Sequence, residues 1–214
     1  MSGQVVGERV AAGIRAHQLE EASDWIHAPL VQEFHTFIPL LDREFKLALP
    51  SYPVVGFASI RNAYATYQRG RGEVGTKDNI TFNVRLLERP KAQLLGTLLH
   101  ELLHLWQAYH GTPGKRAGHN AEYREKALAC GLVVNARGVT VERTETFTAV
   151  LAAHGVDVAG IVEGGAEAPV YGSVQQAQKM KKWVCACAPR PTIVRCATPL
   201  VATCGACGEA FHLA

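Results

Sequence analysis

Apolar residues in the N-terminal quarter of the chain recur at three- and four-residue spacings, the period of one face of an α-helix. We expect a core helix there, preceded by a shorter helix. Pro50 and Pro53 end the pattern because proline interrupts a helix. The stripe consists of Trp25, Ile26, Leu30, Phe34, Phe37, Ile38, Leu41 and Phe45.

The pattern then changes to one rich in β-branched and aromatic residues. Two segments, 54–67 and 79–84, have this composition and predict two or three strands. Between them, residues 68–75 contain three glycines. Because glycine weakens regular structure, we interpret this segment as a flexible turn, such as the tip of a hairpin.

Helical periodicity returns after Pro90, which suits the first turn of a helix, and continues to about His110. A second helix is expected from the N-cap residue Asn120 to about Gly131, and a third over 145–154. The following segment, 155–172, is rich in Gly and Ala without periodicity. We therefore expect a boundary there between a main body and a small C-terminal module.

Composition supports a soluble globular protein. The chain has 214 residues, of which 48% are hydrophobic and 19% charged. Its net charge of +3 is too small to indicate nucleic-acid binding by the chain as a whole. No apolar run reaches the roughly 18 residues of a membrane span, and the charged N-terminus does not resemble a signal peptide. We expect a cytoplasmic protein, free or associated with the nucleoid, with no membrane partner.

The main chemical signal is the sequence His100-Glu101-Leu102-Leu103-His104. Histidines four positions apart project from one face of a helix and can bind one zinc ion together. Glu101 is placed to take a proton from a zinc-bound water and to pass protons to the leaving amine of a peptide. Without a metal, these polar groups in a leucine-rich helix would cost roughly 2 kcal/mol or more each. A metal site is therefore favoured over a chance match.

A catalytic zinc ion usually has three protein ligands, so a third is required. The candidates are His110, His119 and Glu122. His110 follows His104 by six residues, which turns it away from the shared face. His119 follows a loop long enough to return to the metal, and we favour it. Glu122 lies one turn into the next helix, where a carboxylate would also suit the helix dipole.

A second metal signal lies at the C-terminus. Cys185 and Cys187 are followed, after sixteen residues, by Cys204 and Cys207. This spacing is close to that of a zinc ribbon, in which four thiolates bind one structural zinc ion. A pair of disulfides is the alternative in an oxidising compartment.

Two further residues leave the ribbon's ligand set open. The first cysteine pair encloses one residue, where two are commoner, so Cys196 or His212 could replace a ligand. Cys196 is otherwise interpreted as a packed thiol of a strand over 193–197, and Cys130 as a core residue.

The C-terminal module is more basic than the rest of the chain. From Ser173 to the end it has five basic residues and one acidic residue, a net charge of +4. With Trp183 beside the first cysteine pair, such a module could bind phosphates and stack a base, although a solvated charged face is an equal explanation.

These motifs in this order resemble the SprT-like (Spartan-type) family of zinc metalloproteases, and the segments around the histidines and around Cys185 look most like its bacterial members. The resemblance implies zinc ligands at His100, His104 and His119, with Glu101 as general base and acid. It also implies a zincin-like α+β fold, with helices and a small antiparallel sheet, plus a zinc ribbon. Asn120 departs from the common pattern, in which glycine often follows the third histidine.

This interpretation divides the chain into an N-terminal helical extension (1–20), a metallopeptidase domain (21–155), a linker (156–177) and a zinc-ribbon module (178–214). It predicts one catalytic and one structural Zn²⁺, a protein substrate, and contact with DNA through the ribbon. The rival hypothesis is a nucleic-acid-binding or regulatory zinc-ribbon protein with a non-catalytic body.

Overall fold

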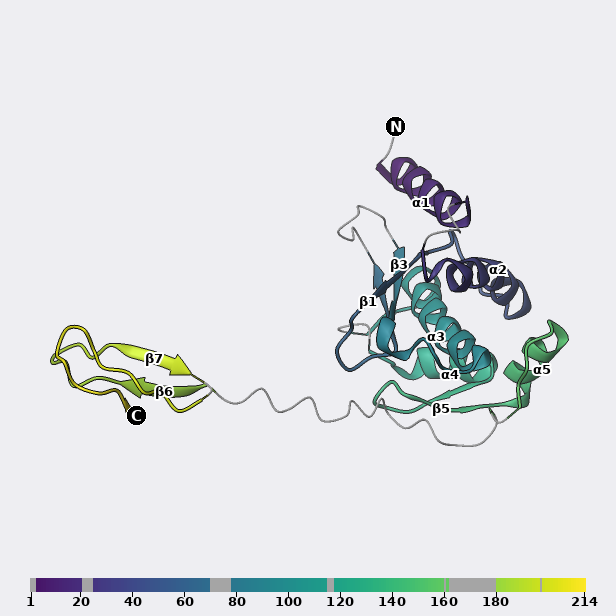
Figure 1. Cartoon of the computed structure of the whole chain (residues 1–214). Helices are drawn as coiled ribbons and strands as arrows, with labels where there is room; N and C mark the ends of the chain where they lie inside the picture. Colours follow the sequence, from purple (N-terminus) through teal and green to yellow (C-terminus); the bar gives the residue numbers. More distant parts are fainter. Residues whose placement is uncertain are drawn as a thin grey trace. The chain divides into compact units, whose positions relative to one another are not determined.

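The computed structural model describes residues 3–20, 25–69, 78–114, 118–159, 161, 180–196 and 198–214. The chain forms two compact units, Met1–Pro169 and Val170–Ala214 (Figure 1). Both helices and small sheets are present, as expected of a mixed α+β protein. None of the described helices has the length and apolar content that a membrane crossing requires.

The predicted core helix is α2, which spans Ala28–Glu44. It buries most of the apolar stripe, including Phe34 and Leu41. Trp25 and Ile26 were wrongly assigned to this stripe, because both precede the helix and are 37% and 85% exposed. Proline in the first turn explains this start, since its fixed φ angle suits a helix beginning and not its interior.

The preceding helix α1 spans Gly3–Glu20 and is 18 residues long against 17 for α2, so the expectation of a shorter helix was wrong. Polar contacts attach it to the body. The Arg15 guanidinium donates to the carbonyl of Tyr52 at 2.6 Å, and the Gln18 amide donates to the carbonyl of Val55 at 2.9 Å. The spacing of apolar residues in the sequence gives no information about such polar contacts.

The main sheet has the order β1-β3-β2, with β1 at Val54–Ala58, β2 at Ala65–Arg69 and β3 at Asp78–Asn83. This confirms the predicted strands. β2 pairs antiparallel with β3, whereas β1 runs parallel to β3, with Phe57 opposite Phe82. The main sheet is therefore mixed, and the expectation of an antiparallel sheet was wrong for β1. The short 3₁₀ helix η1 follows at Val84–Leu86. Of the predicted turn, residues 68 and 69 belong to β2, and the remainder lies outside the described residues.

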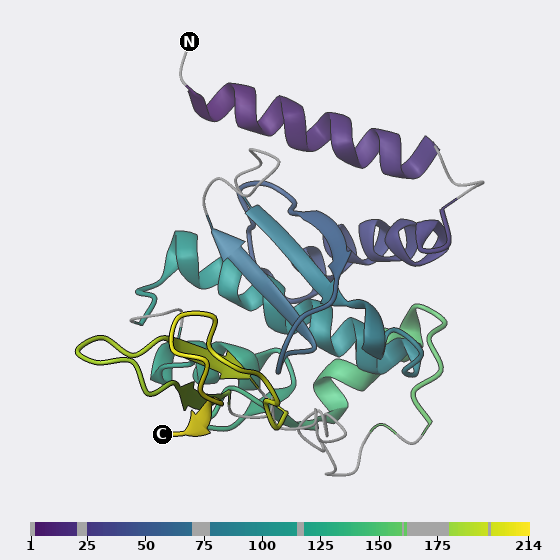
Figure 2. The same ribbon diagram turned by 60° about the vertical axis from the view of Figure 1, so that its left-hand side comes forward.

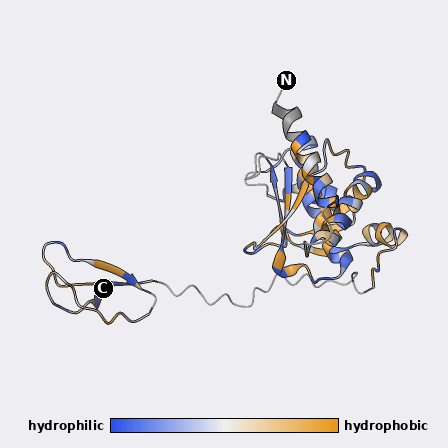
Figure 3. Ribbon diagram, turned by 45° about the horizontal axis from the view of Figure 1, so that its top comes forward, coloured by the Kyte–Doolittle hydropathy of each residue, from blue (hydrophilic) through white to orange (hydrophobic). Residues whose placement is uncertain are grey.

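The long helix α3, Lys91–His110, packs against β2 and β3, and α2 packs against α3 and β1 (Figure 2). Apolar positions on these strands and helices (Figure 3) form the core between sheet and helices. Phe34 of α2 stacks on Phe82 of β3 with ring centroids 4.3 Å apart. The largest fully buried side chains include Phe34, Ile38, Leu41, Leu47, Ile80, Phe82, Leu95, Leu98, Leu99, Leu102, Tyr123 and Phe147.

After α3 the chain forms α4 at Ala121–Ala129 and α5 at Glu145–Ala153, both as predicted. The Asn120 side chain accepts a hydrogen bond from the backbone N–H of Tyr123, which confirms Asn120 as the N-cap. Between the two helices lies an antiparallel hairpin of β4, Leu132–Val134, and β5, Thr140–Arg143, which was not predicted.

In the second unit, β6 at Lys181–Val184 lies between β7 at Ile193–Cys196 and β8 at His212–Leu213, in the order β7-β6-β8. Both neighbours run antiparallel to β6. The predicted strand around residues 193–197 is therefore present as β7. The Gly- and Ala-rich boundary segment lies largely outside the described residues, and the proposed domain limits stay predictions.

Candidate metal centres

Three histidine side chains converge in the first unit. His100 and His104 lie one turn apart on α3, and His119 precedes α4. Nε2 of His119 lies 2.9 Å from Nε2 of His100 and 3.0 Å from Nε2 of His104. All three ligand atoms lie within 4.8 Å of one another. The structure thus brings together the three histidines that the sequence indicated.

This donor set fits a zinc ion. Zinc–nitrogen bonds of about 2.0–2.1 Å place tetrahedral ligands about 3.3 Å apart, so small shifts of the rings would accommodate the ion. Burial lowers the pKa of all three imidazoles, strongly for His100 and to about 3 for His104. Each ring is therefore the neutral base that metal binding requires.

The two alternative third ligands have other partners. Nε2 of His110 lies 2.7 Å from the carbonyl oxygen of Ala48. The Glu122 carboxylate accepts hydrogen bonds from the Gln107 amide and from the backbone N–H of Thr112, both at 2.8 Å. Glu122 thereby connects the end of α3 to the start of α4. Neither residue belongs to the histidine group.

Neighbouring side chains orient the histidines. Nδ1 of His100 lies 3.2 Å from the hydroxyl oxygen of Thr140, so a proton on Nδ1 would leave Nε2 free for a metal. The buried Tyr123 donates to the carbonyl of His100 at 2.9 Å, and its ring stacks on His104 with centroids 4.5 Å apart. These contacts limit the ring positions before any ion is bound.

His119 packs against Gly138 in the turn of the β4–β5 hairpin. A Cβ atom at position 138 would lie 2.2 Å from Cε1 and 2.3 Å from Nδ1 of His119, and the backbone φ there is +80°. Only glycine combines this conformation with the space that the imidazole needs.

Glu101 is 5% exposed and faces the same region. The backbone N–H of Tyr67 donates to its carboxylate, which lowers the pKa, but burial has the larger effect and raises the pKa to about 8. A carboxyl group with this pKa holds a proton at neutral pH, and a cation beside it would favour proton release.

The histidines and Glu101 open onto a cavity of about 440 Å³. Its walls come from β2 and the residues before it, from one face of α3, and from the β4–β5 hairpin. The residues that line it beyond the three histidines and Glu101 include Tyr64, Arg89, Gln93, Thr97, Glu142 and Arg143.

Four thiols converge in the second unit. The sulfur atoms of Cys185, Cys187, Cys204 and Cys207 all lie within 4.8 Å of one another. The Cys187 and Cys204 sulfurs are 3.8 Å apart, the separation expected for tetrahedral ligands with zinc–sulfur bonds of about 2.3 Å. All described cysteines are free thiols, so the disulfide alternative is not what the structure shows. This group is compatible with a zinc ribbon.

Backbone amides support the thiol group. The N–H groups of Cys187 and Thr192 lower the pKa of Cys185 to about 6 because they stabilise its thiolate. Thr192 N lies 3.0 Å from the Cys185 sulfur. The proposed substitutes lie outside the group: the Cys196 sulfur is 3.3 Å from the hydroxyl of Thr198, and His212 is exposed on β8. Cys130 is buried, as predicted.

The hairpin residues were missed by the sequence interpretation. The signal was present, because Val133-Val134 and Val139-Thr140-Val141 flank a short segment that ends in glycine, which is typical of a hairpin. Asn135 supports the turn by accepting backbone N–H bonds from Arg137 and Val139. The hydrogen bond from the backbone N–H of Tyr67 to Glu101 was also missed, since it arises from backbone geometry and not from residue type.

Comparison with known proteins gives a family but no individual relative. Residues 50–145, which contain the three histidines, Glu101 and the hairpin, match the SprT-like family. The searches of curated proteins and of solved structures gave no match.

Proposed function

The chain is a member of the SprT-like family through residues 50–145, and from this we propose that it is a zinc-dependent endopeptidase of zincin type. The observation that carries the proposal is the convergence of three neutral imidazoles and a buried glutamate on one cavity. Three ligands leave one position of a tetrahedral ion open, as catalytic zinc sites require, whereas structural sites are closed by four. A bound zinc ion would acidify water and polarise a peptide carbonyl.

Strand β2 supports a peptide substrate. It is the outer strand of the sheet among the described strands, and its residues line the cavity. The backbone N–H of Asn83 donates to the carbonyl of Tyr64 at 2.9 Å. Because hydrogen-bonded positions alternate along an antiparallel pair, the N–H and C=O groups of Ala65 and the C=O group of Tyr67 point away from β3. An extended peptide could add to this edge by main-chain hydrogen bonds.

Within this arrangement Glu101 is the group that moves protons. Its carboxylate would accept a proton from the attacking water and return it to the amine of the cleaved peptide bond. The Tyr67 N–H holds the carboxylate beside β2, where the substrate backbone would lie. Burial excludes competing water from the same atoms.

The test compares wild-type protein with Glu101→Gln, using an unfolded DNA-binding protein as substrate, with and without single-stranded DNA. We expect zinc content to be equal and cleavage to be lost in the variant. Glu142→Gln is the matched control, because Glu142 lines the same cavity but is exposed. Cleavage retained by pure Glu101→Gln would refute the role of Glu101, and no cleavage by the wild type would favour the non-catalytic alternative.

The second unit suggests that this peptidase acts on DNA-associated proteins. Lys182 and Arg195 are exposed and directly opposite each other in the β6–β7 pair, so their side chains share one face. Two cations on one face suit a phosphate backbone. Lys181 and its cross-strand partner Cys196 lie on the opposite face of the β6–β7 pair.

A salt titration of DNA binding tests this part. Neutralising Lys182 and Arg195 together should weaken binding and reduce the slope of log K against log salt by about 2. The control is Lys181→Gln, which removes one exposed charge from the opposite face. Equal slopes for wild type and the double variant would refute a contact between DNA and this face of the ribbon.

A further inference from the structure

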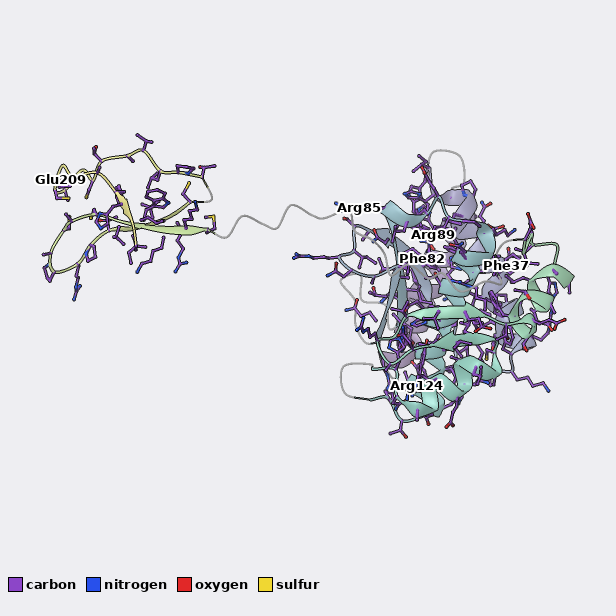
Figure 4. All side chains as sticks on the ribbon, turned by 90° about the horizontal axis from the view of Figure 1, so that it is seen from below. Phe37, Phe82, Arg85, Arg89, Arg124 and Glu209 are labelled. Atoms are coloured by element: carbon purple, nitrogen blue, oxygen red, sulfur yellow. The ribbon has the colours of Figure 1, made fainter. Side chains whose placement is uncertain are left out.

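Two arginines line the cavity beyond the metal ligands. Arg89 follows η1, and Arg143 is the last residue of β5. Arg89 lies within the outline of the first unit in Figure 4, whereas Arg85 lies at its margin. In the part of the chain that the structure describes, neither cavity arginine forms an ion pair with a carboxylate. Among the described residues, these two cations of the cavity wall therefore have no carboxylate in ion-pair contact.

Of the two arginines, Arg143 has the less complete hydrogen bonding. Its Nε atom is buried and has no hydrogen-bond partner among the residues that the structure describes. Burial also lowers the pKa of its guanidinium, the expected cost of holding a cation away from water. A buried N–H of a charged group without an acceptor is costly, so native structures rarely keep one without a reason.

Helix α3 makes room for this side chain. A Cβ atom at Gly96 would lie 2.5 Å from Nε of Arg143. Glycine inside a helix costs about 1 kcal/mol relative to alanine. Glycine at position 96 thus weakens α3 at the place where Arg143 packs, although Nε of Arg143 forms no hydrogen bond within the described part of the chain.

Arg89 is fixed rather than mobile. Its Nε donates to the carbonyl of Leu86 at 2.9 Å, and Nη2 donates to the hydroxyl of Thr97 at 3.3 Å. Its guanidinium carbon lies 4.2 Å from the centroid of the Tyr64 ring. These contacts use part of its five N–H donors and hold the remaining ones at the cavity wall.

We propose that Arg89 and Arg143 form an anionic subsite that binds a carboxylate of the substrate peptide. A carboxylate accepts two parallel hydrogen bonds from a guanidinium and would offset one of the two positive charges of the pair. The acidic residues that line the cavity do not fill this role: Glu101 belongs to the metal centre and Glu142 is exposed. The proposal rests on the proposed peptidase function and specifies its substrate.

Helix geometry places the subsite close to the scissile bond. Gly96, which contacts Arg143, precedes His100 by one turn of α3, about 5.4 Å. An extended peptide advances about 3.3 Å per residue. The carboxylate should therefore belong to a residue within two positions of the bond that is cut, either as an Asp or Glu side chain or as the C-terminus of the peptide.

The experiment uses the full, zinc-loaded chain. Cleavage sites in a peptide library are mapped for wild type, Arg143→Met, Arg143→Lys and the control Arg85→Met, which removes the same charge from an exposed position outside the cavity. Matched peptides with Glu or Gln at the enriched position, and with a free or amidated C-terminus, then give kcat/KM and separate the two sources of carboxylate.

We expect the wild type to prefer the acidic peptide by about 10- to 100-fold, the range of charge-assisted hydrogen bonds. Arg143→Met should abolish this preference, Arg143→Lys should retain part of it, and Arg85→Met should leave it unchanged. A wild type without preference, or equal losses in Arg143→Met and Arg85→Met, would overturn the subsite.

Binding measurements keep the subsite testable if no peptide is cleaved, in which case the proposed function itself has failed. Calorimetry with the same peptides should then show tighter binding of the acidic one, lost in Arg143→Met. Equal binding of both peptides would refute the subsite. So would Arg143-dependent binding of single-stranded DNA in place of the peptide, since the ligand would then be a phosphate.

A stability measurement separates this role from a structural one. Because no acceptor in the described part of the chain depends on Arg143 Nε, Arg143→Met should leave the melting temperature unchanged or raise it while acid preference is lost. A structural ion-pair role predicts the opposite, a marked loss of stability. Gly96→Ala offers a second perturbation, since its Cβ would displace the guanidinium without removing it.

Discussion

Gly138→Ala should damage the histidine centre specifically, although position 138 provides no ligand. The new Cβ would lie 2.2 Å from the His119 ring, and ordinary contact begins near 3.4 Å, so the ring must move by about 1.2 Å. Metal–ligand distances tolerate only about 0.2 Å. His119 would therefore leave the ion or bind it poorly.

The size of the effect follows from this displacement. Substitutions behind a ligand typically weaken metal binding by about 10- to 100-fold, so direct displacement of a ligand should cost at least about 100-fold. The left-handed backbone adds a penalty of about 1–2 kcal/mol to the free energy of folding for any residue with a Cβ. That second cost concerns the fold and not the metal.

The assay is a zinc titration against a chromogenic chelator, with Gly155→Ala as the matched control. Gly155 has a φ of +75°, and a Cβ added there would meet no atom within 4 Å, so this variant carries the backbone penalty without the collision. We expect two zinc ions per chain in the control and one tightly bound ion in Gly138→Ala. If both variants hold two ions with equal affinity, the contact between Gly138 and His119 does not position the ligand.

Two further predictions concern the other parts of the chain. Cys207→Ser should reduce zinc from two ions to one per chain and make the second unit sensitive to protease. The control Cys196→Ser, which changes a cysteine outside the thiol group, should retain both ions. Equal zinc contents in the two variants would contradict the four-thiol site. Burial lowers the pKa of His35 from 6.5 to about 4, so the unfolded chain binds a proton at higher pH than the folded one does. Stability should then fall as pH decreases from about 6.5 to 4. The difference in unfolding free energy between wild type and His35→Gln isolates this effect from metal loss, and a pH-independent difference would rule it out.

The parts of the centre that could be predicted are those with local causes. His100 and His104 share a face because of their spacing alone, and α3 needed only its periodicity and end signals. The N-cap at Asn120 is equally local. Their positions followed from the sequence without knowledge of any distant contact.

Other features depend on contacts between distant segments. The parallel pairing of β1 with β3 carries no local signature, because it brings together residues distant in the sequence, such as the partly buried Phe57 and the buried Phe82. Trp25 and Ile26 continue the apolar spacing but lie before the helix, since the proline in its first turn sets the start. Periodicity alone could not separate these cases.

The β4–β5 hairpin gives the metal centre and the proposed subsite a common support. Its turn holds Gly138 against His119, Thr140 lies beside Nδ1 of His100, and Arg143 packs on Gly96. Because these three contacts come from one short hairpin, its backbone relates the position of the histidines to that of the proposed subsite. In the proposed peptidase, a common support of this kind would help to select a residue beside the bond that is cut, since selectivity depends on holding two parts of the substrate at once.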